Sequence, residues 1–262
     1  MPVRKFLPLV ALLAAFWPVW HWISLRALDD SGTAWELLSL LTLVLFLAAT
    51  PARAGGEEFS PTLPVVLLLA YAATYWFLPP LVRSCIAMTA VAAMCSEIWY
   101  GKRMNLALLG LSLLSVPVIA SLNFYLGYPL RVAVGTLAQA LLQMNGFAVI
   151  REGTLLNWNG QLVSIDAPCS GVKMLWAGLY LSCTLAAVLK LTTQGTALLG
   201  ALAVIVVLLA NVLRTTALFF VETGILTLDD TWHTGVGVIV FTFAAIAVAA
   251  AAHRLKVTAY AA

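Results

Sequence analysis

Long apolar stretches alternate with short polar breaks along most of the chain, and this pattern predicts a bundle of membrane-spanning helices. Each stretch supplies roughly the 20 apolar residues that cross a bilayer. The breaks contain proline, glycine and charged residues, which end apolar helices and lie at the membrane surface. We expect about eight spanning helices, at residues 6–28, 35–50, 62–78, 81–99, 104–125, 169–189, 196–221 and 234–252.

The first apolar stretch, residues 6–28, follows a short basic leader, as the apolar core of a cleaved signal peptide also would. It is longer than such a core, and it contains Trp17, Trp20 and Trp22. It also lacks a clear small-residue cleavage site. We therefore expect an uncleaved first helix.

Residues 126–168 differ from the rest, because they contain no apolar stretch long enough to span a bilayer. The first part, 129–144, has apolar residues at helical spacing, which predicts an amphipathic helix lying in the membrane interface. The second part, 147–165, alternates loosely and carries turn signals at Gly153 and Asn159. This pattern predicts a small β-hairpin on the membrane just before the sixth spanning helix.

The composition supports a membrane protein. Of the 262 residues, 63% are hydrophobic and only 10% are charged, and the mean hydropathy is +1.00. A soluble domain carries roughly a quarter charged residues. We conclude that the chain is an all-α polytopic membrane protein. It contains no zinc-type or nucleotide-binding motif, so we expect no metal, no cofactor and no nucleic-acid partner.

The basic residues fall mainly in every second break, and this sets the expected orientation. With a cytoplasmic N-terminus and eight helices, the cytoplasmic segments hold eight of the 14 lysines and arginines. These eight are Arg4, Lys5, Arg53, Lys102, Arg103, Lys190, Arg254 and Lys256. The segment 126–168 and the starts of the helices at 169 and 234 then lie on the outer side.

A short polar segment, residues 166–173, directly precedes the sixth expected helix and has a cysteine at its centre. Pro168 is typical of a helix start, which would place Cys169 in the first helical turn. There the helix dipole and the free backbone N–H groups lower the pKa of a thiol and favour the nucleophilic thiolate. Lys173, four residues later, would lie on the same face. A buried small side chain at a helix cap explains the segment equally well.

Two further polar residues are expected at the depth of Cys169. Arg214 lies about 27 Å along its helix at ~1.5 Å per residue, and therefore near the outer boundary of a ~30 Å hydrocarbon core. His233 directly precedes the last helix, again on the outer side. An arginine in a spanning segment is usually functional or paired, and a structural pair with Glu222 or Asp166 is the alternative.

Cys169, His233 and Arg214 together form a complete set for acyl transfer. The thiolate attacks a carbonyl, the histidine activates the thiol and then protonates the leaving amine. The arginine stabilises the oxyanion that forms. Asn211, one turn before Arg214, is expected to orient the guanidinium.

At these residues the chain resembles the exosortase/archaeosortase family. Pro-Cys-Ser-Gly at 168–171, Asn-Val-Leu-Arg at 211–214 and the His-Thr-Gly that starts at His233 occur in the order of the family signature and at membrane-helix ends. The resemblance covers roughly residues 60–253. It departs from the family at Pro168, where the usual residue is alanine.

The resemblance implies an integral-membrane cysteine protease and transpeptidase. Cys169 would be the nucleophile, His233 the base and Arg214 the oxyanion-stabilising residue. The supporting residues would be Ser170, Gly171, Lys173 and Asn211. Its substrates would be exported proteins with a C-terminal sorting signal, made of a short motif, one spanning helix and a basic tail. Cleavage would take place among membrane lipids, at the outer face of the cytoplasmic membrane.

The resemblance also suggests how the chain is organised. We expect one integral membrane domain over residues 1–262. Within it, residues 1–58 form the first two helices and residues 59–253 form the catalytic core, which includes the outer segment 126–168. We expect no appended soluble domain.

Two other classes of function fit parts of the sequence. The cysteines are Cys85, Cys95, Cys169 and Cys183. A membrane thiol–disulfide oxidoreductase would use such thiols, but no two of them form a Cys-x-x-Cys pair. A transporter or scaffold would line a pathway with Arg214 and Glu97, but Glu97 is expected near the cytoplasmic end of its helix. The sequence therefore favours the thiol protease and transpeptidase.

Overall fold

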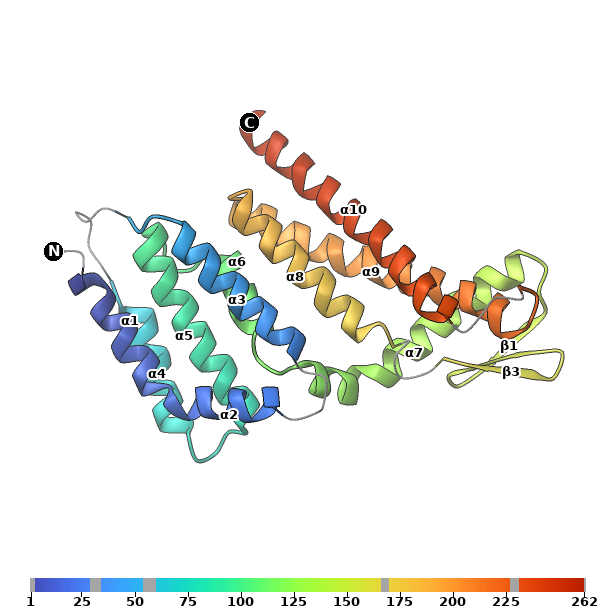
Figure 1. Ribbon diagram of the computed structural model, residues 1–262, viewed down its shortest axis with the longest axis horizontal. Coiled ribbons are helices and arrows are strands. Elements are labelled where there is room, and N and C mark those ends of the chain that lie inside the picture. The colour runs from blue at the N-terminus through green and yellow to red at the C-terminus, as the bar shows by residue number, and fades with distance from the viewer. Residues whose placement is uncertain (1–2, 29–33, 54–59, 166–169, 227–230, 262) are drawn as a thin grey trace. The chain divides into compact units, whose positions relative to one another are not determined.

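The computed structural model describes residues 3–28, 34–53, 60–165, 170–226 and 231–261 (Figure 1). The chain forms two compact units. The first consists of Met1–Val118 with Ala186–Thr196, and the second of Ile119–Leu185 with Ala197–Ala262.

The first unit is helical and is built around one long helix, α5. Its helices are α1 (Val3–Ala15), α2 (Trp17–Leu28), α3 (Ala34–Ala49), α4 (Thr62–Thr74), α5 (Pro80–Tyr100) and α6 (Leu106–Leu114). Helices α1, α2, α4 and α6 all pack against α5, and small residues such as Ala87, Ala90 and Ala93 let them approach closely. Helix α3 lies beside α6 (Figure 1), where the Ser39 hydroxyl donates to the Leu111 carbonyl at 2.8 Å.

The first apolar stretch is a bent pair of helices and not the single helix that we expected. Helices α1 and α2 meet at Phe16 with a bend of 62°. The bend has a direct cause in Pro18, because proline has no N–H and its ring crowds the carbonyl of the residue four positions earlier. The prediction for the next three helices is closer. Helix α3 matches 35–50, and α4 ends at Thr74 before the Pro79–Pro80 break.

The expected helix at 104–125 is wrong. The chain forms two helices there, α6 (Leu106–Leu114) and α7 (Ile119–Met144), with a break between them. Pro117 lies in the break, and it disfavours helical geometry both at its own position and at the residue before it. The interfacial helix expected at 129–144 is the second half of α7. Pro129 removes one backbone hydrogen bond but does not start or end the helix.

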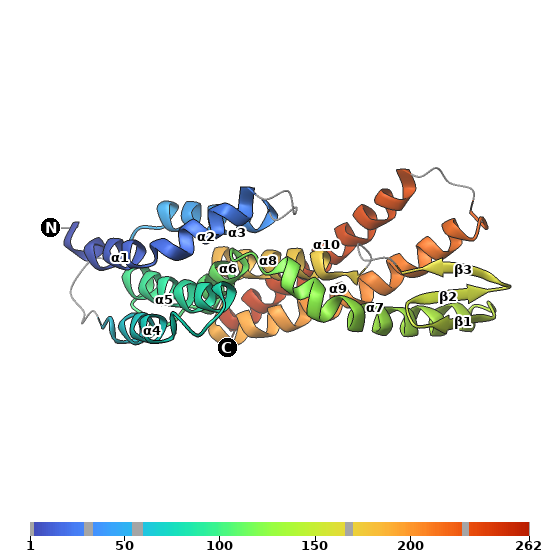
Figure 2. The same cartoon turned by 90° about the horizontal axis from the view of Figure 1, so that it is seen from below.

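The second unit combines four helices with a small sheet. Its elements are α7, β1 (Val149–Glu152), β2 (Leu155–Trp158), β3 (Gln161–Ser164), α8 (Val172–Val188), α9 (Thr193–Glu222) and α10 (Thr231–Ala261). The sheet is an antiparallel meander in the order β1-β2-β3 (Figure 2). It therefore has three strands, one more than the hairpin that we expected. Both turn signals are confirmed. Gly153 has φ +63°, and Asn159 and Gly160 have φ of +52° and +87°, which a type I′ turn requires.

One apolar cluster attaches the sheet to the helices. It is formed by Leu142, Val149, Leu156, Val163, Ile165, Leu218 and Phe219. The alternation of side chains along each strand directs Val149, Leu156 and Val163 to the same face, where they pack against α7 and α9. Ile165 belongs to the cluster, and its backbone N–H donates to the backbone carbonyl of Thr154 at 2.9 Å. The end of the meander is therefore held firmly beside α9.

Length and composition identify some of the helices as able to span a membrane. Among the described residues, α5, α9 and residues Thr234–Thr258 of α10 are long and apolar enough to cross a membrane. The number rises to five if each of the two bent pairs is one span. Helices α3, α4 and α8 are apolar but shorter. The structure thus supports a mostly helical membrane protein, while the eight spans stay a prediction.

Candidate active site

Helix α8 begins at Val172, three residues later than the expected start at 169. Gly171 is the reason, because its φ of +80° is left-handed and cannot continue a right-handed helix. The first backbone bond of α8 joins the Leu175 N–H to the Gly171 carbonyl at 2.8 Å. Cys169 lies outside the described residues. The expectation that Lys173 follows it on one helical face therefore stays a prediction; Lys173 itself is exposed.

Ser170, the residue next to Cys169 in the chain, is anchored on both sides. It is buried, with 4% of its surface exposed. Its hydroxyl donates to Oδ1 of Asn123 on α7 at 3.2 Å, and the Val172 N–H approaches the same hydroxyl at 3.5 Å. Sequence reasoning missed Asn123, although an amide within an expected apolar span was a usable signal.

Asn211 of α9 packs directly against the backbone of Gly171. The amide is buried, with 1% exposed. A β-carbon built on Gly171 would lie 2.6 Å from Nδ2 and 2.9 Å from Cγ of Asn211. The glycine is therefore required twice, once for its backbone conformation and once for this close approach. The structure places Asn211 against the start of α8, a contact that its expected role beside Arg214 did not include.

Arg214 lies one turn further along α9 and contacts α10. Its guanidinium is partly buried. A β-carbon built on Gly237 would lie 3.2 Å from its Nε and 3.5 Å from its Cζ. His233 precedes Gly237 by four residues, so both positions belong to the same face of α10. The side chain of His233 lies outside the described part of the chain. Gly237 was also missed, and a small residue at a helix contact is a weak signal in a sequence.

The two contacts show how α9 connects the site. Asn211 and Arg214 are three residues apart, about 4.5 Å along the helix axis. One contacts the residue that starts α8, and the other contacts the face of α10 that carries position 233. The structure thus brings Ser170, Gly171, Asn211 and Arg214 into one region. Beside it, Thr215, Leu218 and the end of β3 line a cleft of about 10 Å³, which admits roughly one water molecule.

The three described cysteines are free thiols. Cys85 and Cys95 lie on α5, where ten residues separate them by about 15 Å, and Cys183 lies on α8. Cys95 is buried and the other two are partly buried. Such positions are typical of packing residues in membrane helices.

Comparison with known protein families shows which family the chain belongs to. The model of the transmembrane exosortases matches residues 5–250. The chain belongs to the transmembrane exosortase family. The match begins well before residue 60, so the bent pair α1–α2 is part of the family pattern. Exosortase membership supports a membrane enzyme of protein sorting, of the transpeptidase type. Comparison with curated proteins and with solved structures gave no match.

Proposed function

We propose that this exosortase is a cysteine protease and transpeptidase that cleaves the C-terminal sorting signal of exported proteins. Cys169 is the nucleophile, His233 the general base and Arg214 the group that stabilises the oxyanion. The signal consists of a short motif, a spanning helix and a basic tail, and cleavage takes place at the outer face of the cytoplasmic membrane.

The observation that carries the proposal is the pair of contacts made by α9. Asn211 touches Gly171, two residues after Cys169 in the chain, and Arg214 touches Gly237, one turn after His233. Three segments that are distant in sequence thereby meet at adjacent turns of one helix. The Arg214 guanidinium rests against the face of α10 that carries position 233, which is the placement that a role beside His233 needs.

The proposed reaction has two steps. In the first, the Cys169 sulfur attacks the scissile carbonyl carbon while His233 takes the thiol proton, and the carbonyl oxygen becomes negative beside Arg214. Collapse of this intermediate breaks the C–N bond, and His233 gives its proton to the leaving amine. In the second step, an acceptor amine or water attacks the thioester and passes a proton to His233, which restores the Cys169 thiol.

The start of α8 adds to oxyanion stabilisation. The first N–H groups of a helix have no intrahelical acceptors and form its positive end. The hydroxyl of Ser170 receives only a long bond from the first of these N–H groups, that of Val172. The contact of Asn211 with Gly171 holds this helix end in place relative to Arg214.

The direct test is the loss of processing in a Cys169→Ala variant. A tagged exported protein with a sorting signal is expressed together with this chain, and its C-terminus is followed by mass spectrometry of the membrane fraction. We expect no cleavage with Cys169→Ala at normal abundance of the protein. Replacement of Cys85, Cys95 and Cys183 together should leave most cleavage intact. Cleavage by Cys169→Ala at the normal rate would exclude the mechanism.

A further inference from the structure

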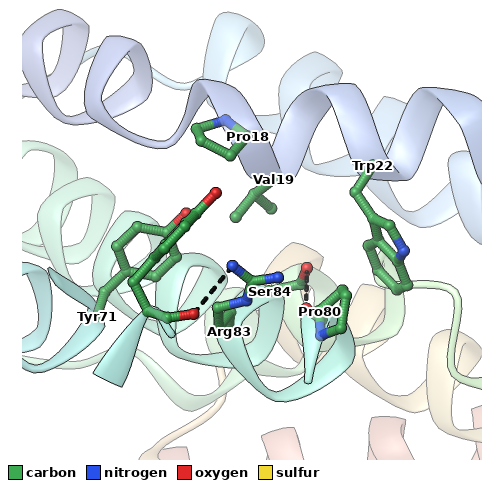
Figure 3. Close-up of a pocket in the computed structure, with 8 residues that line it drawn as sticks. Pro18, Val19, Trp22, Tyr71, Pro80, Arg83 and Ser84 are labelled. Carbon is green, nitrogen blue, oxygen red and sulfur yellow. Dashed lines mark hydrogen bonds between the residues drawn. The ribbon is translucent and has the colours of Figure 1, made fainter. Parts of the chain in front are cut away.

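A small cavity with a mixed polar and apolar lining lies between α2, α4 and α5 in the first unit (Figure 3). Val19 and Trp22 line it from α2, Tyr71 and Tyr75 from the end of α4, and Arg83 from α5. Its volume is about 60 Å³. Since one water molecule needs roughly 10–15 Å³ on this scale, the cavity has room for about five heavy atoms, the size of a phosphate group.

Arg83 brings a positive charge to this cavity. Its Cζ lies 4.3 Å from the centre of the Tyr75 ring, and its Nη1 donates to the Tyr75 carbonyl at 3.1 Å. Its Nε is buried and has no hydrogen-bond partner among the described residues. No carboxylate in the described part of the chain pairs with it either. Arg83 as a whole is partly buried, and a nearby anion stabilises a guanidinium at such a place in a membrane protein.

Tyr71 supplies a second donor. Only 5% of the residue is exposed, and its hydroxyl is buried without a hydrogen-bond partner in the part of the chain that the structure describes. Its ring is fixed edge-on against Phe16, with centroids 4.9 Å apart. Figure 3 shows Arg83 between Tyr71 and Trp22. Two donors without a hydrogen-bond partner among the described residues therefore belong to side chains that line the same cavity, and such donors favour a ligand with acceptor oxygens.

The start of α5 makes the same region favourable to an anion. The helix begins at Pro80, so Arg83 and Ser84 belong to its first turns, where the dipole is positive. Among the lining residues, Pro80 has no N–H and the Arg83 N–H donates to the Pro79 carbonyl at 3.1 Å, so the helix start contributes through its dipole and the Arg83 guanidinium. The cavity therefore combines three independent features that favour an oxyanion.

Exposed aromatic side chains next to the cavity indicate where it lies in the membrane. Trp17 is 67% exposed, Trp76 88% and Phe77 83%, and they flank the lining residues on α2 and after α4. Large exposed aromatic residues gather at the level of the lipid head groups. We propose that the cavity binds the phosphate group of a membrane phospholipid, with Arg83 as its counter-ion and the Tyr71 hydroxyl as a second donor.

The test measures lipid binding to the full chain, purified in a neutral detergent, by native mass spectrometry. The probes are phosphatidylglycerol, diacylglycerol with the same acyl chains, and inorganic phosphate. We expect one tightly bound phosphatidylglycerol per chain, and weaker binding of both other probes. Arg83→Gln should reduce the affinity for phosphatidylglycerol by about tenfold or more, because it removes a charge-assisted bond. Arg103→Gln, at an exposed position between α5 and α6, is the matched control and should bind as the wild type does.

Two variants keep the charge and therefore test the site without a change in net charge. Tyr71→Phe removes a hydroxyl that has no partner among the described residues, so thermal unfolding in lipid-free detergent should not fall. Its affinity for phosphatidylglycerol should fall about threefold to tenfold. Val19→Phe fills the cavity and should compete with the lipid. If both variants bind phosphatidylglycerol like the wild type, the proposal is wrong, even if Arg83→Gln does not accumulate.

Three other results would overturn the assignment. Diacylglycerol bound as tightly as phosphatidylglycerol would show that only the acyl chains are recognised. Inorganic phosphate bound as tightly would show a soluble anion as the ligand. The third concerns Asp29 and Asp30, which follow α2 and lie outside the described residues. The double variant Asp29→Asn/Asp30→Asn is compared with Arg83→Gln and with the combination of all three changes. If each destabilises the protein by the same amount and the combination adds nothing further, an ion pair occupies the site and no lipid is needed.

Discussion

Gly237 of α10 packs against the guanidinium of Arg214 on α9, with the position of its missing β-carbon 3.2 Å from Nε. A glycine in the interior of a helix costs stability relative to alanine. Here the lack of a side chain leaves room for the head group of Arg214. The proposed oxyanion site therefore depends on a residue that has no chemistry of its own.

Gly237→Ala is expected to change stability and turnover in opposite directions. Alanine is favoured over glycine in a helix by ~1 kcal/mol, so the variant should unfold at the wild-type temperature or above it. The added methyl group displaces the guanidinium by a few tenths of an ångström, and we expect sorting-signal cleavage about tenfold slower. Thermal unfolding and single-turnover cleavage in the same detergent measure the two effects.

The matched control is Gly200→Ala on α9, because no described atom lies within 4 Å of a β-carbon at that position. It should gain the helix preference and keep its cleavage rate. A Gly237→Ala variant that cleaves as fast as Gly200→Ala would show that the position of Arg214 is not set by this contact.

Gly171→Ala is expected to destabilise the protein more than Gly146→Ala. Both glycines have left-handed φ, +80° and +86°, so both variants lose about 1–2 kcal/mol through backbone strain. Only at Gly171 does the new β-carbon meet another side chain, Nδ2 of Asn211 at 2.6 Å. Chemical unfolding of the two variants isolates this additional loss.

The double variant Gly171→Ala/Asn211→Ala should recover the part of the loss that comes from the collision, but not the strain. Cleavage should be low in every variant that carries Gly171→Ala and close to normal in Gly146→Ala. Equal destabilisation at the two glycines would contradict the contact between α9 and the start of α8.

Arg214→Lys tests the oxyanion role against a structural ion pair. Lysine keeps the charge but lacks the planar fork of donors. Loss of one oxyanion donor typically costs ~100–1000-fold in turnover, about 3–4 kcal/mol, and we expect a loss of that size at normal protein abundance and substrate crosslinking. Near-normal cleavage would favour an ion pair, while loss of the protein from the membrane would indicate a role in folding.

The side of the membrane can be tested by cysteine labelling, and the break between α6 and α7 makes the test sharp. Helix α6 has nine residues, so it is about 14 Å long, less than half of a ~30 Å hydrocarbon core. In a chain in which Cys85, Cys95, Cys169 and Cys183 are all replaced by alanine, we expect Ser164→Cys to react with an impermeant reagent in intact cells. Lys102→Cys should react only after lysis. Labelling of both in intact cells would show that α6 and α7 do not cross together.

Local signals in the sequence predicted much of the fold. Helix α5 was predicted to within a residue at each end, because Pro80 and Gly101 mark its limits, and Gly101 has the left-handed φ of +59° that a helix end favours. The turns at Gly153 and Asn159 were found for the same reason. Pro18 and Pro117 carried equally clear signals, but the length of the apolar stretches outweighed them in our interpretation.

The contacts of the site could not be predicted in this way. Periodicity and hydropathy report on one segment at a time, whereas the approach of Asn211 to Gly171 and of Gly237 to Arg214 depends on how helices pack. The expected start of α8 is three residues too early because it rests on Pro168, whereas the left-handed Gly171 sets the start of the helix. Family membership supports the ordered motif around Cys169, Arg214 and His233, and the roles of these residues stay predictions.

The spacing of Asn211 and Arg214 on adjacent turns has a mechanical consequence. Helix α9 has 30 residues and a length of about 45 Å, which exceeds a ~30 Å hydrocarbon core, so it tilts as the bilayer thins. A tilt of about 20° changes the relative height of two points 4.5 Å apart by only about 0.3 Å. A tilt of α9 therefore moves Asn211 and Arg214 together, and their relative height is insulated from variations in membrane thickness.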